Sequence, residues 1–186
     1  GRRVSLHDVR EPVRHQDTEM NRAPEIRQPF IRKGQPSDRD GIWNVFLTSV
    51  LEHFSTHYEN AEALSFANSI EPESFDDSIN TRPTLVAEED GKIVAFGQFN
   101  AEQSEVVSLY VAPGFTGRGL GQTLLRKFEE EAQENGSGWM QMGSTLNAVG
   151  FFEKEGYKLS RMEQLQLPDG SSLPRMRMSK SFPEKG

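Results

Sequence analysis

The stretch between residues 109 and 121 restricts the fold of this chain more than any other part of the sequence. An apolar pattern typical of a strand ends at Val111, Pro113 turns the chain, and a helical pattern begins soon afterwards. Glycine tolerates backbone conformations that direct successive N–H groups into one concavity, and a helix N-terminus adds unpaired donors with partial positive charge. The loop therefore predicts an anion site that suits a pyrophosphate, to which Arg118 can add a charge-assisted contact. The glycines that define it occupy alternate positions, Gly117, Gly119 and Gly121.

Other kinds of glycine loop fit this stretch less well. A nucleoside-triphosphate loop ends in Gly-Lys-Ser/Thr, whereas Gly121 is followed here by Gln122. A dinucleotide loop of the Gly-x-Gly-x-x-Gly type requires glycine at position 122 and an acidic residue about 20 positions later, where this chain has Gln141 and Met142. A tight turn without a ligand explains one or two glycines but hardly three at alternate positions after a proline.

The residues before the first strands show a helical pattern. A short apolar piece at residues 30–31 is followed by Ser37, which can cap a helix through its hydroxyl. Two further helices are predicted, one over residues 61–70 with Asn60 as its cap and a short one over residues 75–79. The first helix is predicted from apolar residues spaced as one face, which are Ile42, Val45, Phe46, Val50 and Phe54.

From residue 84 onward, extended and helical patterns alternate. The first two strands are joined by a turn at residues 89–91, which supplies the glycine that a hairpin needs. The order of elements predicts a mixed α/β (α+β) domain with one central, mostly antiparallel sheet flanked by helices. The predicted strands cover residues 84–88, 93–99, 106–112, 139–142, 157–165 and 173–178. A helical pattern returns after Gly121, with Leu120 in its apolar stripe, and a short helix is predicted over residues 147–155.

Composition and charge limit the classes of function. The formal net charge of −7 argues against nucleic-acid binding, which requires clustered Lys and Arg. The chain has no cysteine, which excludes disulfides, a Cys-based zinc site and a cysteine nucleophile, and we expect no metal site. No apolar run approaches the roughly 18 residues that span a bilayer, so we expect no membrane partner and a cytoplasmic location.

The length of 186 residues predicts one folded domain. Residues 1–28 carry many charges and few large apolar side chains, so we expect a flexible N-terminal arm. Met20 lies within this arm and is either the start of translation or part of a natural tail. We expect the single domain to cover residues 29–182.

Two blocks of the sequence resemble the GNAT superfamily of N-acetyltransferases. The family's acetyl-CoA loop reads Val-x-Pro-x-x-Arg/Gln-Gly-x-Gly-x-Gly/Ala, and Thr116 stands here in place of the usual arginine or glutamine. The segment Leu146–Tyr157 is similar to the family's Asn-Ala-x-x-Phe-Tyr-x-x-x-Gly-Phe/Tyr block, and residues 84–99 resemble a hairpin of the family. The loop positions that match are Val111, Pro113, Gly117, Gly119 and Gly121.

The resemblance implies a sheet that splays open between the fourth and fifth strands of the family's fold, with the pantetheine of acetyl-CoA in the gap. These are the strand that ends at Val111 and the strand that starts at Trp139. Backbone groups of Leu109 and Val111 would bond the pantetheine amides as a further strand does. The cofactor-binding residues that the resemblance implies are Leu109, Tyr110, Val111, Thr116, Gly117, Arg118, Gly119, Leu120, Gly121, Gln122, Asn147, Phe151, Phe152 and Lys154.

A candidate base is Glu105, which precedes Val111 by six residues. A free alkylammonium has a pKa near ~10, so an amine acceptor must lose a proton before it attacks a thioester. Glu105 matches the place of the base glutamate in the histone-acetylating branch of the family, where a water could relay the proton. The alternative is an exposed carboxylate at a strand end.

The leaving thiolate also needs a proton, and the tyrosine that supplies it in many family members is replaced here by Phe152. Tyr110 and Ser108 are candidate substitutes, although strand alternation turns both away from Leu109 and Val111. The donor is therefore another group or solvent, or the protein does not catalyse the usual reaction.

The resemblance implies an N-acetyltransferase that moves an acetyl group from acetyl-CoA to the amine of a small molecule or peptide by direct attack. The main alternative is a non-catalytic acyl-CoA-binding protein of the same fold. His53, His57 and Tyr58 lie where the family has its acceptor rim, or form a solvated helix end. Last-strand pairing between subunits occurs in the family, so a homodimer is an expectation.

Overall fold

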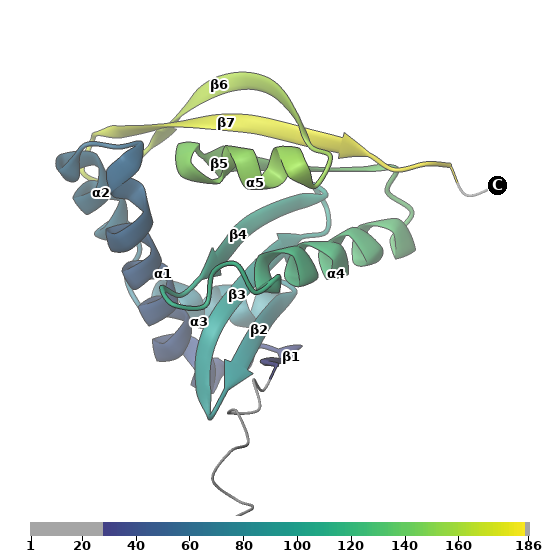
Figure 1. Cartoon of the computed structure of the whole chain (residues 1–186), viewed down its shortest axis with the longest axis horizontal. Helices are drawn as coiled ribbons and strands as arrows, with labels where there is room; N and C mark the ends of the chain where they lie inside the picture. The colour runs from purple at the N-terminus through teal and green to yellow at the C-terminus, as the bar shows by residue number, and fades with distance from the viewer. Residues whose placement is uncertain (1–27, 185–186) are drawn as a thin grey trace, which may run out of the picture.

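The computed structural model describes residues 28–184, whose strands form one seven-stranded sheet in the order β1-β2-β3-β4-β5-β7-β6 (Figure 1). Every neighbouring pair is antiparallel except β4 and β5, which run parallel. This topology confirms the mixed, mostly antiparallel sheet. The strands are β1 (Phe30–Lys33), β2 (Thr84–Glu89), β3 (Lys92–Asn100), β4 (Glu105–Val111), β5 (Trp139–Thr145), β6 (Lys158–Gln166) and β7 (Ser172–Ser181).

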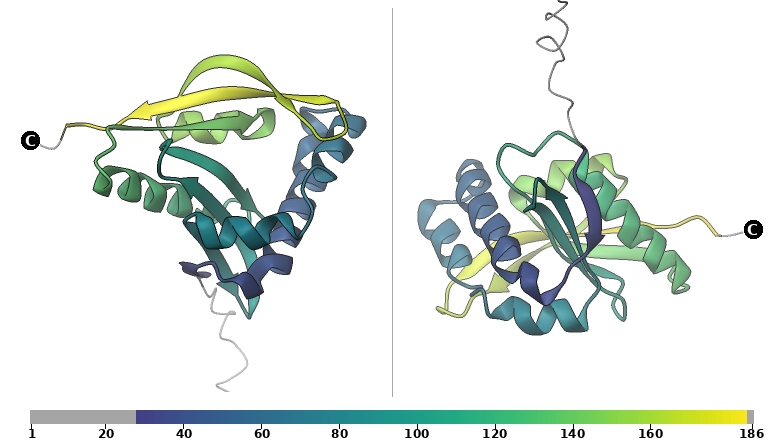
Figure 2. Two further views of the ribbon diagram at one scale, coloured as in Figure 1. Left: turned by 180° about the vertical axis from the view of Figure 1, so that it is seen from behind. Right: turned by 90° about the horizontal axis from the view of Figure 1, so that it is seen from below.

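Helices cover both faces of the sheet (Figure 2). Helices α1, α2 and α3 pack on one face in a cluster with Val86 and Phe96, whereas α4 and α5 contribute to a second cluster with Met140 and Met142 on the other. The helices are α1 (Arg39–His53), α2 (Asn60–Ala67), α3 (Ser74–Thr81), α4 (Leu120–Glu134) and α5 (Val149–Lys154).

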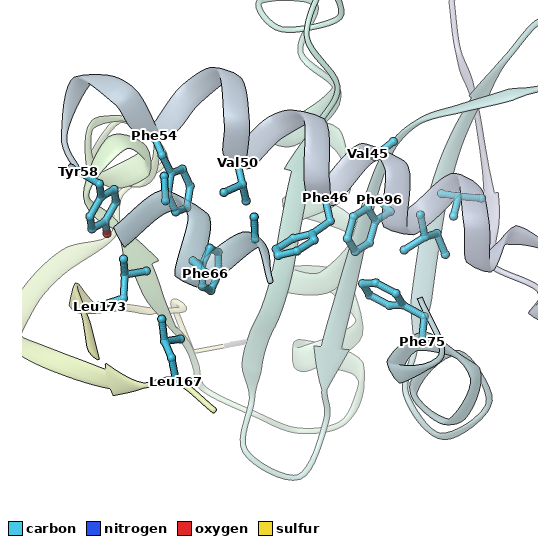
Figure 3. Close-up of a cluster of buried hydrophobic side chains, with 14 of the residues drawn as sticks. Val45, Phe46, Val50, Phe54, Tyr58, Phe66, Phe75, Phe96, Leu167 and Leu173 are labelled. Carbon is cyan, nitrogen blue, oxygen red and sulfur yellow. The ribbon is translucent and has the colours of Figure 1, made fainter. Parts of the chain in front are cut away.

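The apolar face predicted for the first helix is confirmed, because all five of its residues are at most 1% exposed. Phe46 of α1 and Phe54, which begins the 3₁₀ turn after α1, pack against Phe66 of α2 with ring centroids 5.5 and 5.3 Å apart (Figure 3). Full burial of one such ring stabilises the fold by about 1.5–3 kcal/mol. This packing fixes the C-terminal end of α1 beside the end of β4, where Ser49 contacts Val111.

Two predicted helix caps are wrong. Helix α1 is entered through a 3₁₀ turn over Pro36–Asp38, and the Asp38 carboxylate, not the Ser37 hydroxyl, accepts a hydrogen bond from the Gln35 N–H at 2.7 Å. Asp38 is held in this position by two hydrogen bonds from Arg32. Helix α2 begins at Asn60 and is capped by the preceding glutamate, so the cap lies one residue before the predicted one.

The sheet opens between β4 and β5, as predicted. These strands pair only at Glu105 with Gln141 and at Val106 with Met142. Beyond these two pairs β5 continues to Thr145 against β7, while β4 continues to Val111 against β3. Within residues 28–184, one edge of β4 therefore has no strand partner over its last residues.

A bulge in β4 changes which face its residues occupy. Phe99 pairs with Val106 and Gln98 with Ser108, which leaves Val107 without an opposite residue. Val106 and Leu109 consequently pack in the same cluster, below α4 and α5. Glu105 therefore lies on the face of α1, as Tyr110 does.

The close approach of β3 and α4 makes Gly97 sensitive to substitution. A Cβ at this position would lie 2.6 Å from Cε2 of Phe128 and 3.2 Å from the carbonyl oxygen of Ser108. We expect Gly97→Ala to lower the free energy of unfolding by about 1–3 kcal/mol, because a packed ring must move. Chemical denaturation measures this loss, with Gly138→Ala as the control, since a Cβ there meets no atom of residues 28–184 within 4 Å. Equal stability of the two variants would contradict the close packing.

The predicted arm lies outside the described residues except for Gln28, and so does Met20. In the part of the chain that the structure describes, no helix combines the length and apolar character that crossing a bilayer requires.

Candidate active site

The opening between β4 and β5 forms a cavity of about 690 Å³. Its walls come from the glycine loop and α4, the end of β4, the end of α1, and the segment that leads into α5. The residues predicted from the resemblance that line it are Leu109, Tyr110, Val111, Thr116, Gly117, Gly119, Leu120, Gly121, Gln122, Asn147 and Phe151.

The glycine loop has the backbone geometry of an anion site. Gly117 and Gly119 have φ of +76° and +79°, in the left-handed region, and a Cβ at either would meet no atom of the described residues within 4 Å. Within residues 28–184 the backbone N–H groups of residues 116–122 have no hydrogen-bond partner. Seven consecutive unpaired donors at the N-terminus of α4 suit a group with several anionic oxygens.

The free edge of β4 presents backbone groups to the cavity. The Ala112 N–H bonds to the Val94 carbonyl of β3 at 2.8 Å, so by alternation the N–H and C=O groups of Leu109 and Val111 point away from β3. The Val111 carbonyl accepts a hydrogen bond from the Ser49 hydroxyl at 2.6 Å, which occupies one of its lone pairs. An extended amide chain fits against the remaining groups as an added strand.

Asn147 supplies a polar group that the fold leaves unpaired. It lies in the 3₁₀ turn Leu146–Ala148 that follows β5, and its Oδ1 is buried without a hydrogen-bond partner among the described residues. A buried unpaired amide oxygen is costly unless a ligand donates to it. Asn147 lines the cavity, so a ligand amide N–H is the suitable donor.

Aromatic packing explains the last loop glycine. A Cβ at Gly121 would lie 3.3 Å from Cζ of Phe151, so the absence of a side chain lets the first turn of α4 approach α5. Phe152 is 5% exposed and packs edge-on against Phe151 and Tyr157. Phe152 and the exposed Lys154 are not among the residues that line the cavity.

Arg118 is turned away from the cavity that it was predicted to serve. Its guanidinium lies 3.4 Å from the Glu89 carboxylate and 4.8 Å from the centre of the Phe115 ring. Gln122 instead spans the cavity rim, where its Nε2 donates to Glu155 at 2.7 Å.

Two tyrosines on the α1 side stay protonated at neutral pH. Burial raises the pKa of Tyr58 to about 12, and its hydroxyl donates to the Pro174 carbonyl and accepts from the Leu146 N–H. Burial also raises the pKa of Tyr110, whose ring packs edge-on against Phe46. The charge of Arg175 opposes the rise of the pKa in both tyrosines.

Glu105 lies outside the cavity, at the closed end of the splay, where β4 and β5 still pair. Its carboxylate is 17% exposed and lies 3.3 Å from Nη1 of Arg177. Arg177 donates to Glu163 through Nε at 2.8 Å and Nη2 at 2.9 Å, and Glu163 also accepts from Arg175. The sequence analysis did not identify Arg175, Arg177 or Glu163 as site residues. The signal that could have indicated the arginines is their alternation with Met176 and Met178 on β7, which sets both arginines on one face.

Acid should weaken this part of the sheet through Glu163. Hydrogen bonds from Arg177 and Arg175 hold the pKa of Glu163 at about 2, below its ordinary 4.5. The stabilisation from a lowered pKa is complete above the unfolded value and is lost as the pH falls through the folded value. We expect Glu163→Gln to flatten the pH dependence of unfolding between pH 4.5 and 2. Denaturation midpoints across this range measure the slope, and an unchanged slope would contradict the pairing.

The histidines at the end of α1 lie at the rim of the cavity. His53 and His57 both line it, and Nδ1 of His57 lies 2.7 Å from the Thr56 hydroxyl. Among residues 28–184 no group of three or more His, Asp or Glu side chains could hold a metal ion.

Comparisons with known proteins identify the family. The family model described as "Acetyltransferase (GNAT) domain" matches residues 54–180. No curated protein sequence matches the chain. Among solved structures, a GCN5-related N-acetyltransferase from Rhodopseudomonas palustris has a TM-score of 0.78 at 25% identity, over 84% of this chain and 97% of that one.

Two more distant structures share the fold and hold a ligand. The PaiA N-acetyltransferase from Thermoplasma acidophilum, in complex with coenzyme A, has a TM-score of 0.68 at 21% identity, over 82% of this chain and 98% of that one. The putative acetyltransferase yncA from Salmonella typhimurium, with acetyl-CoA, has a TM-score of 0.63 at 20% identity, over 86% of this chain and 97% of that one. With the family model matching more than half of its residues, this chain belongs to the GNAT acetyltransferase family.

Proposed function

We infer that this protein is an N-acetyltransferase that transfers the acetyl group of acetyl-CoA to the amine of a small molecule or peptide. The observation that carries this proposal is the row of unpaired N–H groups at residues 116–122, which opens into the splay between β4 and β5. Coenzyme A and acetyl-CoA in the PaiA and yncA structures support the same ligand for this fold. Acetyl-CoA would supply an acyl group activated as a thioester.

The residues of the cavity fit the parts of that ligand. The loop donors and Gly119 would hold the pyrophosphate, because a helix N-terminus favours negative charge. The N–H and C=O groups of Leu109 and Val111 that point away from β3 would pair with the pantetheine amides, the Val111 carbonyl through the lone pair that Ser49 leaves open. Asn147 would accept an N–H through its unpaired oxygen.

Proton transfer from the acceptor amine is assigned to Glu105. It lies on the α1 face, with Arg177 holding its carboxylate, and a water would connect it to the amine. Phe152 has no proton to donate to the leaving thiolate and packs in the core. Tyr110 lines the cavity and stays protonated, so it or solvent takes the role of donor.

Release of free thiol in the presence of amines distinguishes an acetyltransferase from a non-catalytic acyl-CoA-binding protein. The purified protein is incubated with acetyl-CoA and a panel of amino acids, polyamines and short peptides, while free thiol and acetylated product are measured. We expect thiol release that depends on one class of amine, with one amide formed for each thiol. Binding of acetyl-CoA without release in any of these mixtures would favour the non-catalytic acyl-CoA-binding alternative.

A further inference from the structure

A second hollow lies on the α1 face of the sheet, at the closed end of the splay. It has a volume of about 680 Å³ and is polar, with Glu105, Gln141, Arg161 and Arg177 among its lining residues. The hollow and the cofactor cavity lie along the same face of β5, because Gln141 lines the first and Thr145 lines the second.

Arg175 lies between the two. Gly143 is the residue of β5 midway between Gln141 and Thr145, and a Cβ on it would lie 2.6 Å from both Cζ and Nε of Arg175. The guanidinium therefore covers Gly143, just beyond the last residue pair that joins β4 and β5. Arg175 is not among the lining residues of either cavity, and its guanidinium lies over the part of β5 between them.

One nitrogen of the Arg175 guanidinium is free to bind an anion. Glu163 accepts from its Nε at 3.0 Å and its Nη2 at 2.8 Å, whereas its Nη1 has no hydrogen-bond partner in the described part of the chain. The guanidinium groups of Arg161, Arg175 and Arg177 on this face are balanced by three carboxylates, because Glu105 and Glu163 form ion pairs with them and Glu102 also lines the hollow.

We propose that the acceptor is an amine that also carries a carboxylate, such as an amino acid, and that Arg175 binds this carboxylate. This inference rests on the proposed acetyltransferase function and names its substrate class. A guanidinium recognises a carboxylate through charge-assisted hydrogen bonds, and Arg175 has a free Nη1 for this contact. Glu105 lies along the same face and receives the ammonium end. A polyamine, by contrast, has no anion for the free Nη1 of Arg175 to bind.

The test compares each amino acid with its own amide. The twenty protein amino acids and their α-carboxamides serve as acceptors at pH 8, and spermidine serves as an acceptor without a carboxylate. The carboxylate favours the protonated, unreactive form of the neighbouring amine, so solution chemistry alone favours the amides. We expect at least one amino acid to exceed its amide in kcat/KM by about tenfold or more, the effect of one charge-assisted contact.

Two variants attribute this preference to Arg175. Arg175→Met removes the charge and should bring the ratio of acid to amide to about one. The fold should persist, because Glu163 keeps its two hydrogen bonds from Arg177. Gly143→Ala leaves the charge in place but displaces the flexible guanidinium, and should lower the ratio several-fold. Gly150→Ala is the control and should leave the ratio unchanged, since a Cβ there meets no described atom within 4 Å.

The outcomes separate this inference from the function on which it rests. Equal or faster turnover of every amide, preference for spermidine, or an unchanged ratio in Arg175→Met would overturn the carboxylate assignment while leaving the acetyltransferase intact. Absence of turnover with every amine, in protein that binds acetyl-CoA, would remove the proposed function and this inference with it.

Discussion

Gly119→Asp is expected to weaken binding of acetyl-CoA by at least about 100-fold, because it adds a side chain and a negative charge where the pyrophosphate would lie. The substitution should lower the affinity for acetyl-CoA without destabilising the fold. A Cβ at Gly119 meets no described atom within 4 Å, and aspartate tolerates the left-handed backbone of this position better than most residues. Calorimetric titration with acetyl-CoA measures the affinity, and thermal denaturation checks the fold.

Gly91→Asp is a matched control for this substitution. Gly91 has a φ of +76°, close to the +79° of Gly119, and a Cβ there also has open space within the described structure. It lies in the β2–β3 turn, so the variant adds the same strain and charge away from the cavity. If Gly119→Asp binds acetyl-CoA as tightly as Gly91→Asp, the loop is not the pyrophosphate site.

Glu105→Gln is expected to lower the turnover number by between about 10²- and 10⁴-fold, the range that a general base contributes. Gln keeps the shape and a hydrogen-bond acceptor for Arg177 but cannot take a proton. The affinity for acetyl-CoA should not change, because Glu105 does not line the cofactor cavity. The measurement is the rate at saturating acceptor, together with a titration of acetyl-CoA.

The control for this variant is Glu130→Gln, which removes the same charge from the exposed side of α4. We expect it to keep the original turnover number. A rate at saturating acceptor that is the same in both variants would show that Glu105 is structural and serves only to pair Arg177.

The parts of the site that depend on local sequence were predictable. The glycine loop and the start of α4 follow from spacing within a dozen residues, because glycine positions and apolar periodicity act over short distances. The splay between β4 and β5 followed from the family resemblance. Strand β5 extends three residues beyond its predicted end, since Gly143–Thr145 carry no apolar alternation and are extended only because β7 pairs with them.

The parts that depend on distant contacts were not predictable. The partner of Glu105 is Arg177, 72 positions later, and no local pattern links the two. The bulge at Val107 places Glu105 on the α1 face, although strict alternation would have set it on the face of Leu109. Arg118 lies within the glycine loop in sequence. Its guanidinium nevertheless pairs with Glu89 and lies over the Phe115 ring, and it does not line the cavity.

The central claim is that the splay between β4 and β5 holds acetyl-CoA, and calorimetric titration of the purified protein with acetyl-CoA tests it most directly. The structure predicts saturable binding with one molecule per chain, and competition by coenzyme A. No detectable heat or saturation at millimolar acetyl-CoA, with correctly folded protein, would contradict the assignment of the cavity and of the function built on it.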